Sequence, residues 1–147
     1  MDLLRRAVIE RELGNFHFLP YQPREELEDS LAAADVHLVS LLPALEGLIM
    51  PSKLYGILAA GRPLIFIGDL EGDIAQVIRH GECGLAVEVN AYHDLVEAIR
   101  RLKSNPQTCA DMGERGRRML LARYSLDQAL ELWKIVLEVS QDSSSIR

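Results

Sequence analysis

The chain is poor in cysteine, in targeting signals and in long apolar runs, and each shortage excludes a class of protein. Only two of the 147 residues are cysteines, Cys83 and Cys109, and neither lies in a C-x-x-C pair. This usage fits a reducing compartment and argues against a zinc site. No apolar run is long enough to cross a bilayer, and the first residues lack the uninterrupted apolar core of a signal peptide. We therefore expect a soluble, cytoplasmic protein.

Positive charge is also scarce, because 16 lysines and arginines face 22 acidic residues and leave a net charge of −6. No basic stretch is dense enough to follow a phosphate backbone, so nucleic acid is not an expected partner. Hydrophobic residues make up 48% of the chain, which is enough for a sizeable core. We expect one domain over residues 1–140, followed by a polar tail at 141–147.

Short apolar strands alternate with amphipathic helices along most of the sequence. The predicted strands are 16–19, 36–42, 63–68 and 84–89, and the predicted helices are 3–13, 25–33, 52–60, 73–80, 90–105, 108–124 and 127–139. The segment 36–42 is apolar enough to be buried on both faces of a sheet. This alternation predicts an α/β fold, a Rossmann-like parallel sheet with helices on both faces and a long helical carboxy-terminal end.

A lysine in the first turn of a predicted helix marks the candidate site. In an open α/β sheet, ligands bind at the carboxyl ends of the strands, and the loop 43–51 is the longest segment there. It runs into Ser52, a candidate helix cap, and Lys53, a cation where the helix dipole is unfavourable to positive charge. A bound phosphate would explain Lys53, and a solvated surface lysine explains it equally well.

Three segments together resemble a known family. They are "ADVHLVSLLPALEGLIMPSKLYGILAAGRPLIFIG", "GDIAQVIRHGECGLAVEVNAYHDLVEAIRRL" and "MGERGRRMLLARYSLDQALELW". In order and spacing they resemble the carboxy-terminal domain of group 1 (family 4) glycosyltransferases, which have the GT-B fold of two Rossmann-like domains facing across a cleft. The Pro-Ser-Lys helix start is similar to that of bacterial amino-sugar and fucosamine transferases of surface polysaccharide synthesis.

The resemblance implies a donor-binding half of a glycosyltransferase. Such domains bind a UDP or GDP sugar as substrate, without a bound metal or other cofactor, and transfer the sugar to a polysaccharide or lipid-linked acceptor. The implied donor-binding residues are Glu46, Gly47, Ser52, Lys53 and Leu54. No catalytic residue is assigned. The acceptor site would lie mostly in an amino-terminal domain, which the resemblance implies is missing here together with the first strands of this domain.

Two departures from the family pattern matter for function. The glutamate that usually binds the ribose hydroxyls would fall at Gly56, and glycine has no carboxylate to accept those hydrogen bonds. The second departure is the missing amino-terminal domain. Because half of the cleft would then be missing, we expect the isolated chain to be inactive. An alternative is therefore a non-catalytic remnant or accessory module that binds nucleotide or docks onto another polypeptide. A sugar-nucleotide epimerase, which shares the two-domain fold, is a weaker alternative.

The remaining candidates have mainly structural interpretations. His37 lies in a predicted strand, where burial is the expectation rather than catalysis. Glu71, Gly72 and Asp73 sit on the ligand edge, and an ordinary turn with Asp73 as helix cap is favoured over sugar contact. The last helix carries a stripe of Leu130, Trp133 and Leu137 that fits burial. Without an amino-terminal domain its apolar face would drive self-association, and the acceptor would bring peripheral contact with a membrane.

Overall fold

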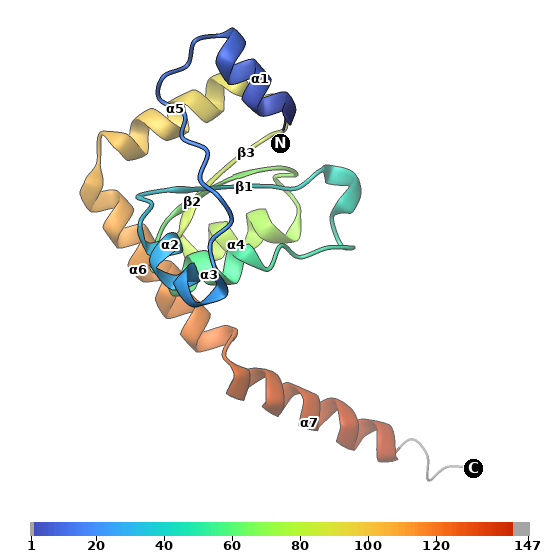
Figure 1. Cartoon of the computed structure of the whole chain (residues 1–147). Helices are drawn as coiled ribbons and strands as arrows, with labels where there is room; N and C mark the ends of the chain where they lie inside the picture. Colours follow the sequence, from blue (N-terminus) through green and yellow to red (C-terminus); the bar gives the residue numbers. More distant parts are fainter. Residues whose placement is uncertain (1, 143–147) are drawn as a thin grey trace.

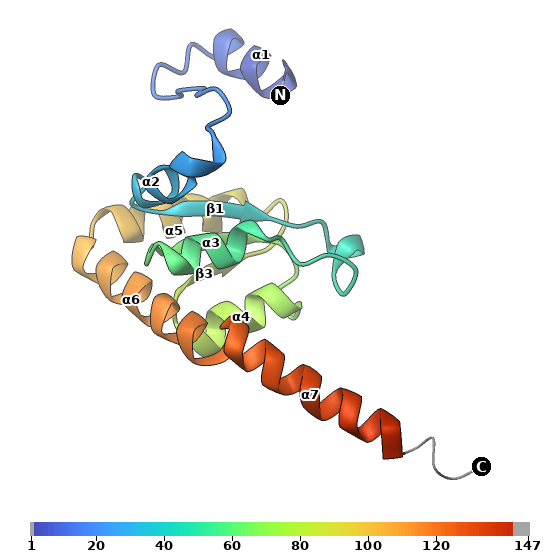
Figure 2. The same ribbon diagram turned by 60° about the horizontal axis from the view of Figure 1, so that its bottom comes forward.

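The computed structural model describes residues 2–142 and shows a three-stranded parallel sheet between helical layers (Figure 1, Figure 2). The strand order is β1–β2–β3, and Val39, Phe66 and Ala86 lie side by side across it. The strands are β1 (His37–Ser40), β2 (Leu64–Ile67) and β3 (Gly84–Val87). The helices are α1 (Asp2–Glu10), α2 (Leu27–Ala32), α3 (Lys53–Ala59), α4 (Asp73–Gly81), α5 (Tyr92–Lys103), α6 (Pro106–Arg123) and α7 (Leu126–Asp142), with 3-10 turns η1 (Arg24–Glu26) and η2 (Pro43–Leu45).

The alternation of side chains along β2 divides the interior into two cores. Leu64 and Phe66 point into the core formed with α2, α3 and α4, and Ile65 points into the core formed with α5 and α6. All three side chains are fully buried. Burying a side chain of this size contributes about 1.5–3 kcal/mol, so the central strand anchors both helical layers.

β1 is an edge strand, and the prediction that segment 36–42 is buried on both faces is wrong. His37 and Val39 are buried, whereas Leu38 is 53% exposed and Ser40 is exposed. The reason is that α5 packs against β2 and β3, which leaves the outer part of that sheet face uncovered. Strand and helix boundaries elsewhere follow the predicted alternation closely.

The predicted strand at 16–19 is also wrong, so the sheet has three strands within residues 2–142 where four were expected. Residues 16–19 form irregular chain, with Phe16 47% exposed and Leu19 75% exposed. An extended segment becomes a strand only when a neighbouring strand accepts its hydrogen bonds. The sheet of the described residues offers this segment no such neighbour.

The helical end forms as predicted, but its apolar stripe does not pack on the body. α6 and α7 match the two expected segments, and α7 extends away from the sheet in both views (Figure 1, Figure 2). Leu130, Trp133 and Leu137 are 50%, 63% and 58% exposed, so the predicted burial of this stripe is wrong. α7 continues to Asp142, and the rest of the expected polar tail lies outside the described residues.

Within residues 2–142, no helix is both long enough and apolar enough to span a lipid bilayer.

Candidate functional site at the carboxyl edge of the sheet

The loops that follow β1 and β2 leave the sheet at the same edge. The amide of Leu41 donates to Ile67 O at 3.1 Å, and the amide of Gly68 donates to Val87 O at 3.0 Å. These two bonds extend the ladder one residue past each strand, so the starts of both loops are fixed. Residues 41–52 then lead to α3, and residues 68–72 lead to α4. This is the edge at which open parallel sheets bind ligands.

Glu46 and Gly72 bring the two loops into contact. Gly72 is the residue before the first turn of α4, and an ideal Cβ built on it would lie 2.5 Å and 2.7 Å from the two carboxylate oxygens of Glu46. Glu46 Oε1 is buried and accepts no hydrogen bond within the described part of the chain. An acceptor without a donor is costly inside a protein, so Oε1 is free to accept a hydrogen bond from a water molecule or a ligand.

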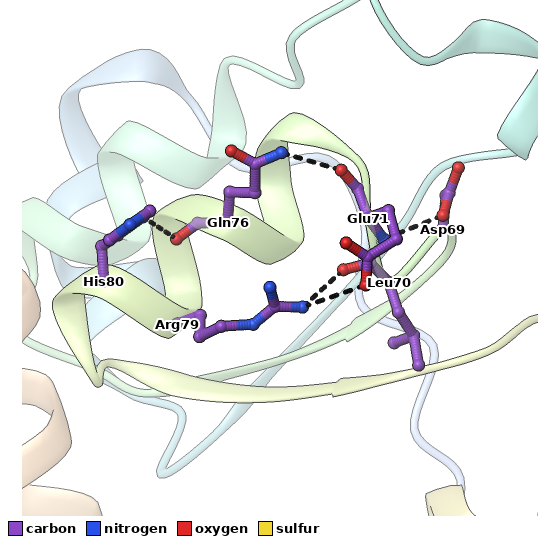
Figure 3. A network of polar contacts seen from close by, with 6 residues as sticks. All are labelled: Asp69, Leu70, Glu71, Gln76, Arg79 and His80. Carbon is purple, nitrogen blue, oxygen red and sulfur yellow. Dashed lines mark hydrogen bonds and ion pairs between the residues drawn. The ribbon is translucent and has the colours of Figure 1, made fainter.

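The loop beside Gly72 is held by side chains of α4. Asp69 Oδ1 accepts the amide of Glu71 at 2.9 Å, and Gln76 Nε2 donates to Glu71 O at 2.9 Å. Arg79 donates to Leu70 O at 2.8 Å and lies 3.6 Å from the Glu71 carboxylate. Figure 3 shows Gln76 and Arg79 reaching the loop from α4, while Asp69 bonds to Glu71 within the loop itself. The contacts are exposed and individually weak, and all of them favour the same conformation of this loop.

Ser52 and Lys53 start α3, but Ser52 does not cap it as expected. Ser52 occupies the N-cap position with helical backbone angles, and its hydroxyl makes no capping hydrogen bond. Lys53 is exposed and makes no ion pair in residues 2–142. Leu54 is 1% exposed, and its amide donates to Pro51 O at 3.0 Å. The side chain of Leu54 therefore belongs to the core, whereas the side chains of Ser52 and Lys53 are exposed.

Asp73 is not the cap of α4, contrary to the prediction. It is the first residue of the helix, while Gly72 occupies the N-cap position and no side chain caps the first turn. The acidic side chain still lies in the first turn, where negative charge is favourable to the helix dipole.

Gly47, in the loop before α3, and Gly56, within α3, are glycines for different structural reasons. Gly47 has a φ of +72°, a left-handed conformation that glycine adopts without strain. Gly56 lies inside α3, where an ideal Cβ would sit 2.8 Å from Leu31 Cδ1. The space that a side chain at position 56 would need is thus filled by α2.

The buried histidine and the two cysteines have structural environments. The ring of His37 donates through Nε2 to Leu31 O at 2.8 Å, and burial lowers its pKa, so the ring is neutral at pH 7. Burial raises the pKa of the Cys83 thiol to about 11 and also raises that of Cys109. Neither thiol is a ready nucleophile at neutral pH. Residues 2–142 contain no group of three or more His, Cys, Asp or Glu side chains placed to hold a metal ion.

One hollow of the described residues lies away from this edge, and another lies nearer to it. A cavity of about 630 Å³ opens beside Leu38, Arg62, Ile99, Lys103 and Cys109, where α5 and α6 leave β1 uncovered. A smaller hollow of about 310 Å³ lies nearer the loops, bordered by Met50, Asp73, His80, Arg123 and Tyr124. The first exposes mostly apolar surface close to the amino ends of the strands, where parallel sheets rarely bind polar ligands.

Comparison with known proteins identifies the family. The model of the glycosyl transferases group 1 family matches residues 2–119, most of the described chain. The chain belongs to this family. Its fold is that of one Rossmann-like half of a GT-B enzyme, as shown by a match to sucrose-phosphate synthase from Thermosynechococcus elongatus with a TM-score of 0.76 and 23% identity. That match covers 96% of this chain and 34% of the synthase chain.

Two curated proteins are similar in sequence to this glycosyltransferase family member. An exopolysaccharide phosphotransferase of Streptomyces coelicolor is 30% identical over 112 residues, which are 76% of this chain and 11% of that protein. The probable glycosyltransferase WbjE of Pseudomonas aeruginosa is 30% identical over 78 residues, 53% of this chain and 20% of that protein. The chain thus spans only a small part of the length of these relatives.

The contact that sequence reasoning missed is the one between Glu46 and Gly72. The sequence pointed separately to the Glu46 loop and to Glu71–Asp73, because each follows a buried strand. It gave no reason to pair them, since nothing in the spacing tells that a carboxylate from one loop lies on the backbone of the other. The adjacency of β1 and β2 in a parallel sheet was the available signal.

Proposed function

We propose that the carboxyl edge of this sheet binds the nucleotide-sugar donor, a UDP or GDP sugar, of a glycosyl transfer reaction. The observation that carries the proposal is the buried, unpartnered Glu46 Oε1, set between two strand-end loops beside the first turn of α4. The family of the chain makes sugar transfer the relevant chemistry. The proposed acceptor is a polysaccharide or a lipid-linked glycan, and the name of one relative, an exopolysaccharide phosphotransferase, supports the polysaccharide.

Glu46 suits the sugar part of such a donor. A sugar hydroxyl or amino group carries the hydrogen that Oε1 lacks, and a hydrogen bond to a charged acceptor contributes about 1.5–3 kcal/mol. Gly47, the next residue, turns the chain through its left-handed conformation directly after this carboxylate. A neutral donor group, rather than a phosphate, is the group expected next to this carboxylate, since two anions would repel each other.

Lys53 suits the diphosphate. Its ammonium is exposed and makes no ion pair within residues 2–142, so it can meet a phosphate without breaking an existing contact. Charge develops on the leaving diphosphate during sugar transfer, and a cation fixed at that position stabilises it. Ser52, with its uncommitted hydroxyl, is placed beside Lys53 to add a hydrogen bond, and Leu54 supports this turn from the core.

The rest of the reaction would come from outside this chain. An amino-terminal domain would supply the acceptor side of the cleft, so we expect the isolated chain to bind donor without transferring sugar. The chain spans 11%, 20% and 34% of three similar proteins. This supports the proposal that donor binding and acceptor binding lie in different segments of a longer protein. We place the activity in the cytoplasm, with contact to the inner face of the membrane through the acceptor, and without a metal or cofactor.

Calorimetric titration of the purified chain with UDP and GDP tests the proposal. We expect saturable binding of one nucleotide, weakened about tenfold or more in Lys53→Ala, because one charge-assisted contact is lost. Lys103→Ala is the matched control, since it removes an exposed lysine beside the 630 Å³ cavity at the other side of the fold. Absence of binding by the folded chain, or equal losses in both variants, would contradict the proposal.

A second candidate function is a non-catalytic nucleotide-binding or docking module. The observation that favours it is Gly56, where Leu31 occupies the space of a ribose-binding side chain. The discriminating measurement is sugar transfer after mixing the chain with a separately produced acceptor domain. Restored transfer supports the enzyme, and nucleotide binding without transfer supports the module.

A further inference from the structure

The contact between Glu46 and Gly72 raises a question about why a glycine stands before α4. Its φ of −70° and ψ of 165° belong to an extended conformation that any residue adopts. The backbone therefore does not require glycine at this position. What does require it is space, because a Cβ at position 72 would overlap the carboxylate of Glu46.

We propose that Gly72 is a positioning residue that holds the Glu46 carboxylate at the sheet edge by leaving room for it against the α4 backbone. This inference rests on the donor-binding function proposed above and specifies how the sugar end of that site is set. Glu46 comes from a long loop and forms no hydrogen bond through Oε1. Its place is therefore defined by the surface on which it lies, and that surface is the backbone at Gly72.

The loop that forms this surface is held by three hydrogen bonds. Asp69, Gln76 and Arg79 hold residues 70 and 71 through one hydrogen bond each, as drawn in Figure 3. The backbone of α4 begins directly after Gly72. The atoms nearest to a methyl group at position 72 are all in the carboxylate of Glu46, so we expect this carboxylate to move. Since that carboxylate is the end of a flexible side chain, the displacement leaves the fold intact.

The consequence is specific to the sugar part of a ligand. Displacing the Glu46 carboxylate removes one hydrogen bond to the sugar and leaves contacts to the base and diphosphate unchanged. We therefore expect Gly72→Ala to lower the ratio of affinity for a nucleotide sugar to affinity for the nucleotide alone by about tenfold, the order expected for one charged hydrogen bond. A general weakening of the fold would reduce both affinities together.

The test is a double-mutant cycle measured by calorimetry on the full chain. The probes are UDP-glucose, UDP-N-acetylglucosamine and GDP-mannose, each compared with UDP or GDP alone. The variants are Gly72→Ala, Glu46→Ala, the double variant and Gly14→Ala, a control whose Cβ would meet no atom within 4 Å. We expect the two single variants to lower the ratio equally, the double variant to lower it no further, and Gly14→Ala to leave it unchanged.

The outcomes separate this inference from the proposed function. If Glu46→Ala lowers the ratio and Gly72→Ala does not, or if the two losses add in the double variant, Gly72 does not act through Glu46. If Glu46→Ala leaves the ratio unchanged, the sugar role of Glu46 is wrong and the inference falls with it. If the wild-type chain binds none of the probes, the donor-binding function itself is overturned.

Discussion

His37 is buried at the start of β1, and its environment links the stability of the fold to pH. Burial is the main cause of its lowered pKa, and the positive charges of Lys53 and Arg62 act in the same direction, while the bond to Leu31 O acts against them. The unfolded chain takes up a proton as the pH falls through about 6.5, and the folded chain resists it. The stability that a neutral His37 provides is therefore present above pH 6.5 and is lost as the pH falls below it.

We expect the free energy of unfolding, measured by urea denaturation, to decrease between pH 7.5 and pH 5.5. His37→Gln keeps a hydrogen-bond donor and removes the titration, so its stability should change less over this range. The exposed His93→Gln is the matched control for the same substitution away from β1. Equal slopes in all three proteins would show that carboxylates or other groups, and not His37, govern this pH range.

A substitution at position 56 tests whether packing of α2 leaves too little room for a glutamate side chain in the middle of α3. The Cβ of any side chain there would meet Leu31 Cδ1 at 2.8 Å, and Leu31 is only 7% exposed. We expect Gly56→Glu to lower the free energy of unfolding by about 1–3 kcal/mol through overpacking. In a Leu31→Ala background, which has the space, the same substitution should cost clearly less. Equal costs in both backgrounds, measured by chemical denaturation, would contradict this account of the missing ribose carboxylate.

At the scale of elements, α6 is held to the turn between α3 and β2 by close backbone approach. A Cβ on Gly113 would overlap the carbonyl of Gly61, and one on Gly116 would lie 2.9 Å from Leu58 Cδ2. The obstacle at Gly113 is backbone, whereas Gly116 faces the end of the Leu58 side chain and Cys83 Cβ at 3.0 Å, so the two positions should differ in tolerance.

We expect Gly113→Ala to lower the free energy of unfolding by about 1–3 kcal/mol, although alanine is the better helix former. Gly116→Ala should cost less, because Leu58 can shift. Thermal unfolding followed by circular dichroism gives the comparison, with Gly14→Ala as a glycine outside any helix. A Gly113→Ala protein as stable as the wild type would mean that α6 does not approach the turn this closely.

Helices and strands that carry their own apolar pattern could be predicted from the sequence. Features that depend on contact with another segment could not. The prediction of a strand at 63–68 is confirmed, because its apolar run is short and ends in Gly68. The predictions of α6 and α7 are confirmed, because the apolar periodicity extends over many residues. Residues 16–19 have the same strand-like composition and remain irregular, since pairing depends on another segment. The exposure of Leu38 could not be predicted either. It depends on which strands α5 covers, and α5 packs on β2 and β3.

At the scale of the site, residue types could be predicted and contacts could not. The Lys53 turn was found because a cation at a helix start is unusual. The missing cap bond of Ser52 and the closeness of Glu46 to Gly72 depend on loop conformation, which is the least constrained part of a sequence pattern.

At the scale of the whole molecule, α7 presents an apolar face away from the body. Leu126, Leu130, Trp133 and Leu137 recur at spacings of four, three and four residues, and each is at least 50% exposed. This is the spacing of a two-helix seam. We expect the chain to self-associate with increasing concentration in sedimentation velocity, and Leu130→Glu to shift it toward the monomer. Trp133 is the single tryptophan, so its emission should move to shorter wavelength as the chain associates.

The exposed Leu121→Glu on α6 is the control for added negative charge. A chain that stays monomeric across the concentration range would contradict self-association through α7. Equal effects of both glutamate substitutions would show that charge alone, and not the α7 face, controls association.

The central claim is that a nucleotide sugar binds at the carboxyl edge of the sheet. Its most direct test is to follow the backbone amide resonances of the isotope-labelled chain while UDP or GDP is added. We expect the largest shifts on residues 46–54 and 68–73, with few changes in α5 and α6. Shifts centred on Leu38, Arg62 and Lys103, around the 630 Å³ cavity at the other side of the fold, would contradict it.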